Sequence, residues 1–220
     1  MTAPDVRVVA DPDAVAREGA ALLAEALRDA VAARGSCTIA VSGGGTPRRA
    51  FARLAVEDLP WDAITFFQVD ERVAPDGDDD RNLTHLEAAF ASVPARIDPM
   101  PVTDPDLDAA AAAYEARLPE RFDVIHLGIG PDGHTASLIP GDPVLEVVDR
   151  RVALTSVYNG RRRMTLTYPA LSAAYRHIWL IAGADKRDAL AKLRVGDPSV
   201  PAGRVGHAGT LIVCDAASAS

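Results

Sequence analysis

Short apolar runs alternate along the chain with longer stretches in which apolar residues recur at helical spacing. The runs predict strands over Val6–Val9, Cys37–Val41, Ile64–Val69, Asp123–Ile129, Val152–Val157, Ile178–Ala182 and Leu211–Cys214. The longer stretches predict helices over Ala14–Ala33, Pro47–Val56, Leu83–Phe90, Asp106–Leu118 and Asp185–Leu193. Because strands alternate with helices, we expect an α/β fold with a mostly parallel sheet, right-handed crossovers and helices on both faces.

Local end signals support these boundaries, and no break divides the chain. Asp11 or Asp13 is placed to cap the first long helix, and Gly35 to end it. Pro47 suits the first turn of the next helix. The 220 residues contain no linker, low-complexity tract or internal repeat, so we expect a single domain over residues 1–220. The closing AASAS segment is expected to fray.

The composition narrows the class of protein. Hydrophobic residues make up 48% of the chain, which allows a substantial core, and the net charge is −8. That charge argues against a general nucleic-acid or anionic-membrane binder, yet an anionic small substrate needs only a local cluster of donors. No apolar run approaches the ~18 residues that span a membrane and no signal segment is visible, so we expect a cytoplasmic protein. Cys37 and Cys214 lie in apolar strands and are expected to be buried free thiols.

The stretch Phe122–Pro140 is the first candidate for an active site. It begins as a buried strand and breaks at three glycines, Gly128, Gly130 and Gly133. Asp132 and His134 follow at the carboxyl end of that strand, where a helix could start. Open α/β sheets bind their ligands at this edge, so an acid and an imidazole together indicate chemistry there.

A second glycine-rich turn, Ser42–Pro47, also joins a strand to a helix. A helix N-terminus attracts anions, and glycines let its N–H groups approach a phosphate. For either turn alone, an anion site and a merely tight strand-to-helix connection are equally good interpretations. Two such turns in one sheet, with the Thr46 hydroxyl, favour a bound anion. Gly128–Gly133 formally matches G-x-G-x-x-G without the following helix and strand, and Ser42–Pro47 lacks the P-loop lysine, so neither NAD nor ATP is predicted.

The histidines and the cations divide into candidate site residues and residues with no expected role. His134 is the one histidine in a glycine-flanked turn beside an acid; His85, His126, His177 and His207 lie in other settings, and no pair has zinc-site spacing. The acidic loop before Asn82 lacks EF-hand spacing and is expected to be solvated. Arg72, Arg163 and Lys186 fall just beyond predicted strand ends, which meet at one edge of a parallel sheet. Cations gathered there would suit a phosphorylated substrate.

Six motifs resemble the 6-phosphogluconolactonase family, in the family's order. They are SGGGTP at 42–47, DERV at 70–73, RN at 81–82, LGIGPDGHTASLIPG at 127–141, RMTLT at 163–167 and GADK at 183–186. The resemblance covers about residues 10–215 and implies a three-layer αβα, Rossmann-like fold of the glucosamine-6-phosphate deaminase/ribose-5-phosphate isomerase type. It also implies hydrolysis of 6-phospho-D-glucono-1,5-lactone to 6-phosphogluconate in the oxidative pentose phosphate pathway, without a metal or organic cofactor.

The resemblance also implies roles for individual residues. His134 would be the catalytic acid and base that activates water, with Asp132 beside it. The substrate-binding residues would be Gly43, Gly44, Gly45, Thr46, Asp70, Arg72, Gly130, Gly133, Arg163 and Lys186. Family members often carry Lys-Pro-Pro before the arginine of RMTLT, whereas this chain has Tyr158–Arg162, so Arg161 or Arg162 could replace that lysine. The expected partner is a small sugar-phosphate lactone, and the expected state is a monomer or weak homodimer.

Two other functions stay open on the sequence. A sugar-phosphate isomerase or deaminase of the same fold would carry Asn-Glu-Pro after its Asp-Gly-His turn, and here Ile139 replaces the glutamate. A non-catalytic sugar-phosphate sensor usually adds a helix-turn-helix segment, which is not visible, and would leave His134 without a role. Hydrolysis of the lactone would separate the enzyme from the sensor.

Overall fold

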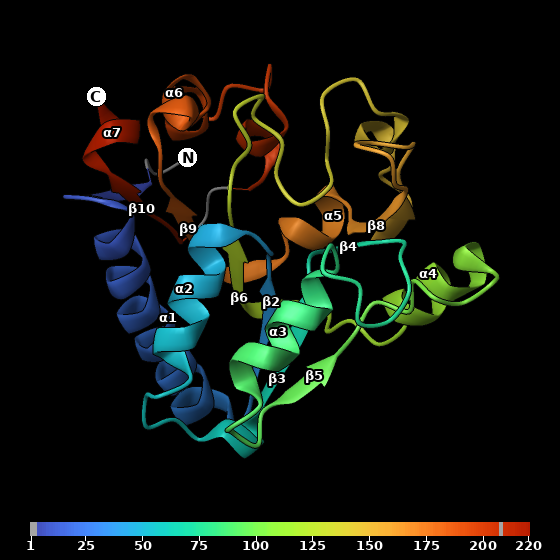
Figure 1. Ribbon diagram of the computed structural model, residues 1–220, viewed down its shortest axis with the longest axis horizontal. Coiled ribbons are helices and arrows are strands. Elements are labelled where there is room, and N and C mark those ends of the chain that lie inside the picture. The colour runs from blue at the N-terminus through green and yellow to red at the C-terminus, as the bar shows by residue number, and fades with distance from the viewer. Residues whose placement is uncertain (1–3, 207–208) are drawn as a thin grey trace.

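A seven-stranded parallel sheet forms the centre of the structure, a computed structural model that describes residues 4–206 and 209–220 (Figure 1). Its strands lie in the order β1 (Asp5–Val9), β10 (Thr210–Asp215), β9 (Ala174–Ile181), β6 (Phe122–Leu127), β2 (Cys37–Val41), β3 (Ile64–Gln68) and β5 (Arg96–Asp98). Every pair of neighbours is parallel. The order changes direction around β6 and β2, which places the loops after these strands together at the sheet's carboxyl edge.

Helices cover both faces of this sheet and bury two apolar cores. The helices are α1 (Pro12–Arg34), α2 (Gly45–Leu54), α3 (Asn82–Phe90), α4 (Leu107–Glu115), α5 (Tyr168–Leu171), α6 (Arg187–Val195) and α7 (Ala216–Ala219). The first three pack on one face, and α4, α5 and α6 on the other. Strand β6 alternates between the cores, with Val124 in one and Ile125 and Leu127 in the other. The predicted three-layer α/β fold is confirmed.

A second, antiparallel sheet of three strands lies beside the main one. It contains β4 (Asp70–Arg72), β8 (Arg163–Leu166) and β7 (Val152–Leu154), in the order β4–β8–β7. The sequence placed a strand at Val152–Val157 in the parallel sheet, which is wrong, and it predicted none of β4, β5 and β8. These three missed strands are short and each begins with a charged residue, so their apolar runs are too brief to indicate a strand.

The caps of α1 were predicted correctly, whereas the structure of the C-terminal segment was not. Asp11 caps α1 by accepting from the Ala14 N–H at 2.8 Å, and Gly35 ends it with φ 79°. The terminal AASAS segment was expected to fray, but it forms α7, because Asp215 accepts from the Ser218 N–H at 2.9 Å and Ser218 is buried. No described helix is long and apolar enough to cross a membrane.

Candidate active site

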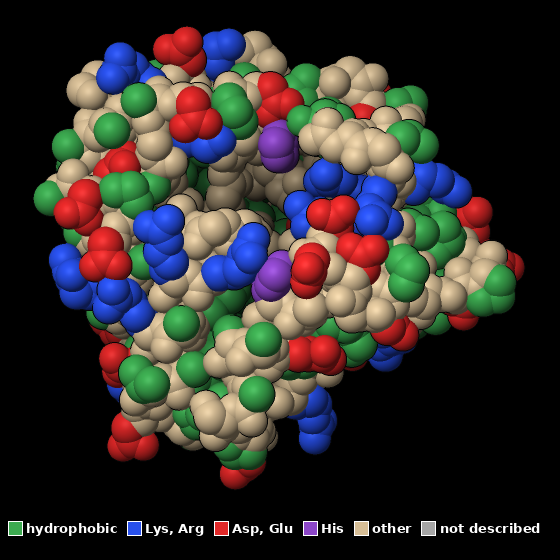
Figure 2. Space-filling model, in the orientation of Figure 1, with side chains coloured by type: hydrophobic (Ala, Val, Ile, Leu, Met, Phe, Trp, Pro, Cys, Tyr) green, Lys and Arg blue, Asp and Glu red, His purple; other side chains and the backbone are tan. Residues whose placement is uncertain are grey.

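A cavity of about 250 Å³ opens at the carboxyl ends of β2, β6 and β9 (Figure 2). Figure 2 shows the hollow on the face of the molecule, with basic side chains and a histidine around it. Of the predicted site residues, those that line it are Gly43, Gly44, Gly45, Thr46, Asp70, Arg72, Gly130, His134, Arg163 and Lys186. Asp132 and Gly133 do not line the cavity. Asp132 pairs with the His134 ring, and the Gly133 N–H donates to the Gly130 carbonyl in the same loop. The structure therefore brings the sequence candidates together from five separate segments.

His134 and Asp132 form a hydrogen-bonded pair at one end of the pocket. The His134 ring Nδ1 lies 2.6 Å from Asp132 Oδ1, and the His134 backbone N–H donates to the same oxygen at 3.1 Å. An ionised carboxylate can only accept, so Nδ1–H is the donor and Nε2 is left free to accept a proton. Partial burial raises the pKa of Asp132, but the two contacts from His134 outweigh it and hold that pKa below its usual value.

The loop after β6 holds His134 without any helix. We expected a helix to start near Asp132 and His134, and this was wrong. The Gly130 N–H donates to the His134 carbonyl at 2.8 Å, which closes a tight loop, and Gly133 takes a left-handed φ of 82°. A methyl group on Gly130 would lie 2.1 Å from the His134 ring, so only glycine allows the ring to pack there.

The N-terminus of α2 faces the same cavity. Gly44 is its N-cap residue, and no side chain in the described part of the chain caps it, so the first N–H groups of the helix stay available to a ligand. These donors and the helix dipole favour an anion. The turn after β2 therefore leads into a helix N-terminus, as expected, whereas the turn after β6 has no helix behind it.

Arg72 and Arg163 face each other across β4 and β8. They are direct partners in the antiparallel register, which places two like charges side by side. Burial lowers the pKa of Arg163, nearby Asp70 opposes this shift, and Arg72 adds to it. The Nε atoms of both arginines are buried, with no hydrogen-bond partner among the described residues. An anion in the cavity, which both side chains line, would offset the repulsion between the two guanidinium groups.

Arg163 is carried to the pocket by a different strand from the one expected. The sequence placed it beyond the end of a parallel strand, but it starts β8 of the small sheet. Lys186 does follow β9, and its Nζ lies 2.9 Å from Asp185 Oδ2. Arg161 and Arg162, which we considered as replacements for a family lysine, do not line the cavity. Arg161 instead pairs with Asp78 and Asp80.

Three supporting residues were missed by sequence reasoning. Asn82 lines the cavity, and its Oδ1 accepts from Arg72 Nη1 at 2.9 Å. Buried Glu71 accepts the N–H groups of Arg72 and Asn82, each at 2.8 Å. Ser137 donates to Asp70 Oδ2 at 2.6 Å. The adjacency of DERV and RN at the two ends of one loop was a usable signal for Asn82, but nothing local points to Ser137.

Three other histidines, His85, His126 and His177, do not line the cavity. His85 is half-buried on α3, and its Nε2 is 2.8 Å from the Asp79 carbonyl oxygen. His126 and His177 are buried in β6 and β9, and His207 lies outside the described residues. Within residues 4–206 and 209–220, no group of three or more histidine, cysteine or acidic residues is arranged to hold a metal ion.

Comparisons with known proteins agree with this geometry. Residues 10–213 match the family described as glucosamine-6-phosphate isomerases/6-phosphogluconolactonase. A Nostoc sp. protein named 6-phosphogluconolactonase is 38% identical over 202 residues, covering 86% of this chain and 84% of that protein. A Streptomyces coelicolor protein of the same name is 35% identical, and the match covers 99% of this chain and 94% of that protein. The crystal structure of 6-phosphogluconolactonase from Thermotoga maritima matches with a TM-score of 0.86 at 26% identity, covering 96% and 99%.

The matched segment extends from just before α1 almost to the end of β10, and so includes five strands of the parallel sheet in full and most of β10. The two named relatives cover most of the chain at more than 30% identity. The resemblance drawn from the six motifs is confirmed. The chain belongs to the glucosamine-6-phosphate isomerase/6-phosphogluconolactonase family.

Proposed function

We propose that this chain is a 6-phosphogluconolactonase, which hydrolyses 6-phospho-D-glucono-1,5-lactone to 6-phospho-D-gluconate. This reaction is the second step of the oxidative pentose phosphate pathway. Relatives that carry the name match most of the chain at 35–38% identity. The observation that carries the proposal is one pocket with an acid-paired histidine at one end and clustered cations beside an uncapped helix. The acid-paired histidine suits proton transfer, and the cations beside the helix N-terminus suit the binding of a phosphate.

The cations and the α2 N-terminus bind the phosphate in this account. Arg72, Arg163 and Lys186 line the cavity together with the Ser42–Pro47 turn. Charge-assisted hydrogen bonds to phosphate are about twice as strong as neutral ones, so several of them fix the far end of the substrate. Binding energy at the phosphate then holds the lactone carbonyl beside His134, which lowers the barrier without any contact at the reacting atoms.

His134 carries the two proton transfers. Its Nε2 removes a proton from water as the water oxygen bonds to the lactone carbonyl carbon. The protonated ring then returns a proton to the ring oxygen of the lactone as the ester C–O bond breaks. Asp132 orients the ring and stabilises its charged form through the 2.6 Å contact. General acid–base help of this kind is worth ~10²–10⁴ in rate.

The loop that carries His134 has few donors for the oxyanion. The backbone N–H groups of Gly130, Gly133 and His134 donate to Oδ1 of Asp132 or to carbonyls within the loop. These three N–H groups are therefore not free to stabilise an oxyanion. Other donors on the cavity wall include the N–H groups of the Ser42–Pro47 turn and the side chains of the cations.

The direct test measures lactone hydrolysis. The substrate is generated freshly from glucose 6-phosphate by its dehydrogenase, and its disappearance is followed with and without the protein. We expect a rate well above the spontaneous background. A rate equal to the background would overturn the proposal, and tight binding of 6-phosphogluconate without hydrolysis would favour the sensor.

Deamination is the rival activity on this fold, and the structure offers an observation against it. Ile139 stands where the deaminase motif has its glutamate, and it is buried. A carboxylate for the additional proton transfers is therefore missing from that position. We expect no ammonia release from glucosamine 6-phosphate under conditions in which the lactone is hydrolysed.

Cytoplasmic localisation and a monomeric or weakly dimeric state belong to the same proposal. Cys37 and Cys214 are both free and buried, which suits a reducing compartment. Sedimentation velocity over a range of protein concentrations tests the oligomeric state, and a tight, concentration-independent oligomer would contradict it.

A further inference from the structure

A β-hairpin carries Tyr158 against His134 and Arg163, two residues that line the pocket. Its strands are β7 and β8, and at its tip Tyr158 and Arg161 exchange backbone hydrogen bonds of 2.9 and 3.3 Å. Asn159 and Gly160 form the turn between them, with φ of 51° and 80°. Two left-handed residues in an Asn-Gly pair are the preferred geometry of a tight two-residue hairpin. The tip is therefore a defined turn with a fixed direction for the Tyr158 side chain.

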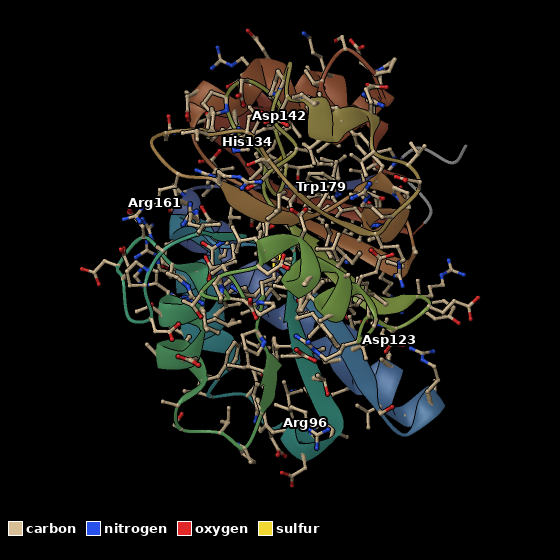
Figure 3. All side chains as sticks on the ribbon, turned by 90° about the vertical axis from the view of Figure 1, so that its right-hand side faces the viewer. Arg96, Asp123, His134, Asp142, Arg161 and Trp179 are labelled. Atoms are coloured by element: carbon tan, nitrogen blue, oxygen red, sulfur yellow. The ribbon has the colours of Figure 1, made fainter. Side chains whose placement is uncertain are left out.

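Contacts at the tip and at the base tie this hairpin to its surroundings. Arg161 extends from the tip toward the loop after β4 (Figure 3). There its Nε donates to Asp80 Oδ2 at 3.1 Å and its Nη2 to Asp78 Oδ2 at 3.0 Å. Near the base, the Ser156 N–H donates to Asp142 Oδ2 at 2.9 Å, and Asp142 belongs to the loop that follows His134.

The Tyr158 ring lies between the two functional ends of the pocket. Its centroid is 6.1 Å from that of the His134 ring, with the rings inclined by 64° in an edge-to-face arrangement. On the other side, Arg163 Cζ lies 5.1 Å from the Tyr158 centroid, within the range of a cation–π contact. A single aromatic ring thus touches both the imidazole and the guanidinium.

Arg163 has few other contacts that could fix it. Among the described residues its Nε has no hydrogen-bond partner, and its Nη1 donates to Ser137 Oγ at 3.4 Å, a long contact. Arg72, its neighbour across the strands, repels it, while the Asp70 carboxylate attracts it. The face of the Tyr158 ring therefore supplies an attractive contact that is present before any anion binds.

We propose that Tyr158 is a positioning residue, whose ring holds Arg163 and His134 at their working separation. Arg161 fixes the hairpin tip on Asp78 and Asp80, so that it acts on the pocket through Tyr158 and touches no substrate. This inference rests on the proposed lactonase activity and adds to it a link between phosphate binding and proton transfer. The hydroxyl of Tyr158 has no part in it.

The test compares Tyr158→Ala with Tyr158→Phe. Loss of the ring should lower kcat/KM for the lactone by about tenfold or more, with a higher KM from the loosened Arg163 and a lower kcat from the loosened His134. Tyr158→Phe keeps the ring and should retain near wild-type values. Arg161→Gln should shift both constants in the same direction by a smaller factor, and the matched control Arg162→Gln, whose side chain makes no ion pair with the acidic loop, should shift neither.

A binding measurement separates this inference from the proposed activity. Calorimetric titration with inorganic phosphate probes Arg163 without any hydrolysis, and Tyr158→Ala should bind phosphate several-fold more weakly than Tyr158→Phe. If wild-type protein failed to hydrolyse the lactone while this difference held, the lactonase proposal alone would fall. Equal kinetics and equal phosphate binding in Tyr158→Ala and wild type, at equal folded fraction, would overturn the positioning role.

Discussion

At the scale of residues, the chemistry depends on which nitrogen of His134 carries the proton. The Asp132 carboxylate accepts from Nδ1–H and leaves Nε2 free. Replacing Asp132 with Asn supplies an amide that can donate to Nδ1 and so stabilises the wrong tautomer. We expect Asp132→Asn to lower kcat by roughly 10²-fold or more while KM changes little. Steady-state kinetics check this, and an unchanged kcat would show that the acid does not direct the histidine.

Gly130 provides a second test at this scale. A methyl group there would lie 2.1 Å from the His134 ring and 2.7 Å from Asp132 Oδ1. Gly130→Ala must therefore displace the ring or the loop, and we expect a fold-preserving loss of kcat. Circular dichroism verifies the fold and kinetics measure the loss. Full activity in this variant would mean that the ring position seen here is not the one used in catalysis.

Single residues also show how far sequence reasoning reaches. His134 stood out because glycines and an acid surround it, a local signal. Arg161 looked equivalent to Arg163, but Asp78 and Asp80, about eighty residues earlier, draw it away from the pocket. Ser137 was invisible because its hydroxyl acts through Asp70, far away in the chain. Local patterns find reactive groups, whereas side-chain direction is decided by partners distant in sequence.

At the scale of elements, buried Glu71 holds the start of α3 and the end of β4 together. Its carboxylate accepts from the N–H groups of Asn82 and Leu83 at 2.8 Å, and Arg81 Nε lies 3.4 Å away. Removing its charge leaves these donors and buried Arg81 less well satisfied. We expect Glu71→Gln to lower the free energy of unfolding by about 1–3 kcal/mol, measured by urea denaturation.

Asp76 supplies a matched control for that variant. It also pairs with Arg81, but its side chain is 80% exposed, whereas that of Glu71 is 0% exposed. Asp76→Asn should therefore cost less than about 1 kcal/mol, because exposed ion pairs contribute little. Equal losses in the two variants would contradict the capping role of Glu71.

Helices and strands could be predicted from the sequence where their apolar pattern extends over enough residues. The strand at Cys37–Val41 was predicted residue for residue, and α1 to within two residues at each end, because burial and capping signals agree there. The small sheet was not predicted, because β4 and β8 are short and carry pocket-facing polar residues. The Asn159–Gly160 pair was an overlooked hairpin signal.

At the scale of the whole molecule, both apolar cores share the strands of one sheet. Neighbouring residues of β6 lie in different cores, so neither core can lose its packing without exposing the other. We predict a single cooperative unfolding transition for residues 1–220, with circular dichroism and tryptophan fluorescence giving one midpoint. Two separated midpoints would contradict the single-domain prediction.

His126 couples the stability of this molecule to pH. Burial lowers its pKa from 6.5 to about 3, so the folded protein keeps the ring neutral while the unfolded chain takes up a proton below about pH 6.5. Stability from this residue is therefore present above pH 6.5 and is lost as the pH falls toward 3. Between pH 7.5 and 5 the loss is about 2 kcal/mol, from roughly 1.4 kcal/mol per pH unit below 6.5.

Two histidine variants check this pH dependence. His126→Gln keeps an acceptor for the Ser42 N–H, which lies 3.3 Å from Nδ1, and should flatten the loss of stability between pH 7.5 and 5. His85→Gln, at a half-buried position on α3, should leave the slope as in wild type. The same slope in both variants would rule out His126 as the group responsible.

The most direct measurement of the central claim compares wild type with His134→Ala on freshly generated 6-phosphogluconolactone. The phosphate-binding side of the pocket is intact in that variant, so binding of 6-phosphogluconate, measured by calorimetry, should stay within a few-fold of wild type. The rate above spontaneous hydrolysis at saturating substrate should fall by ~10²–10⁴. Near-normal turnover with His134 removed would contradict the account.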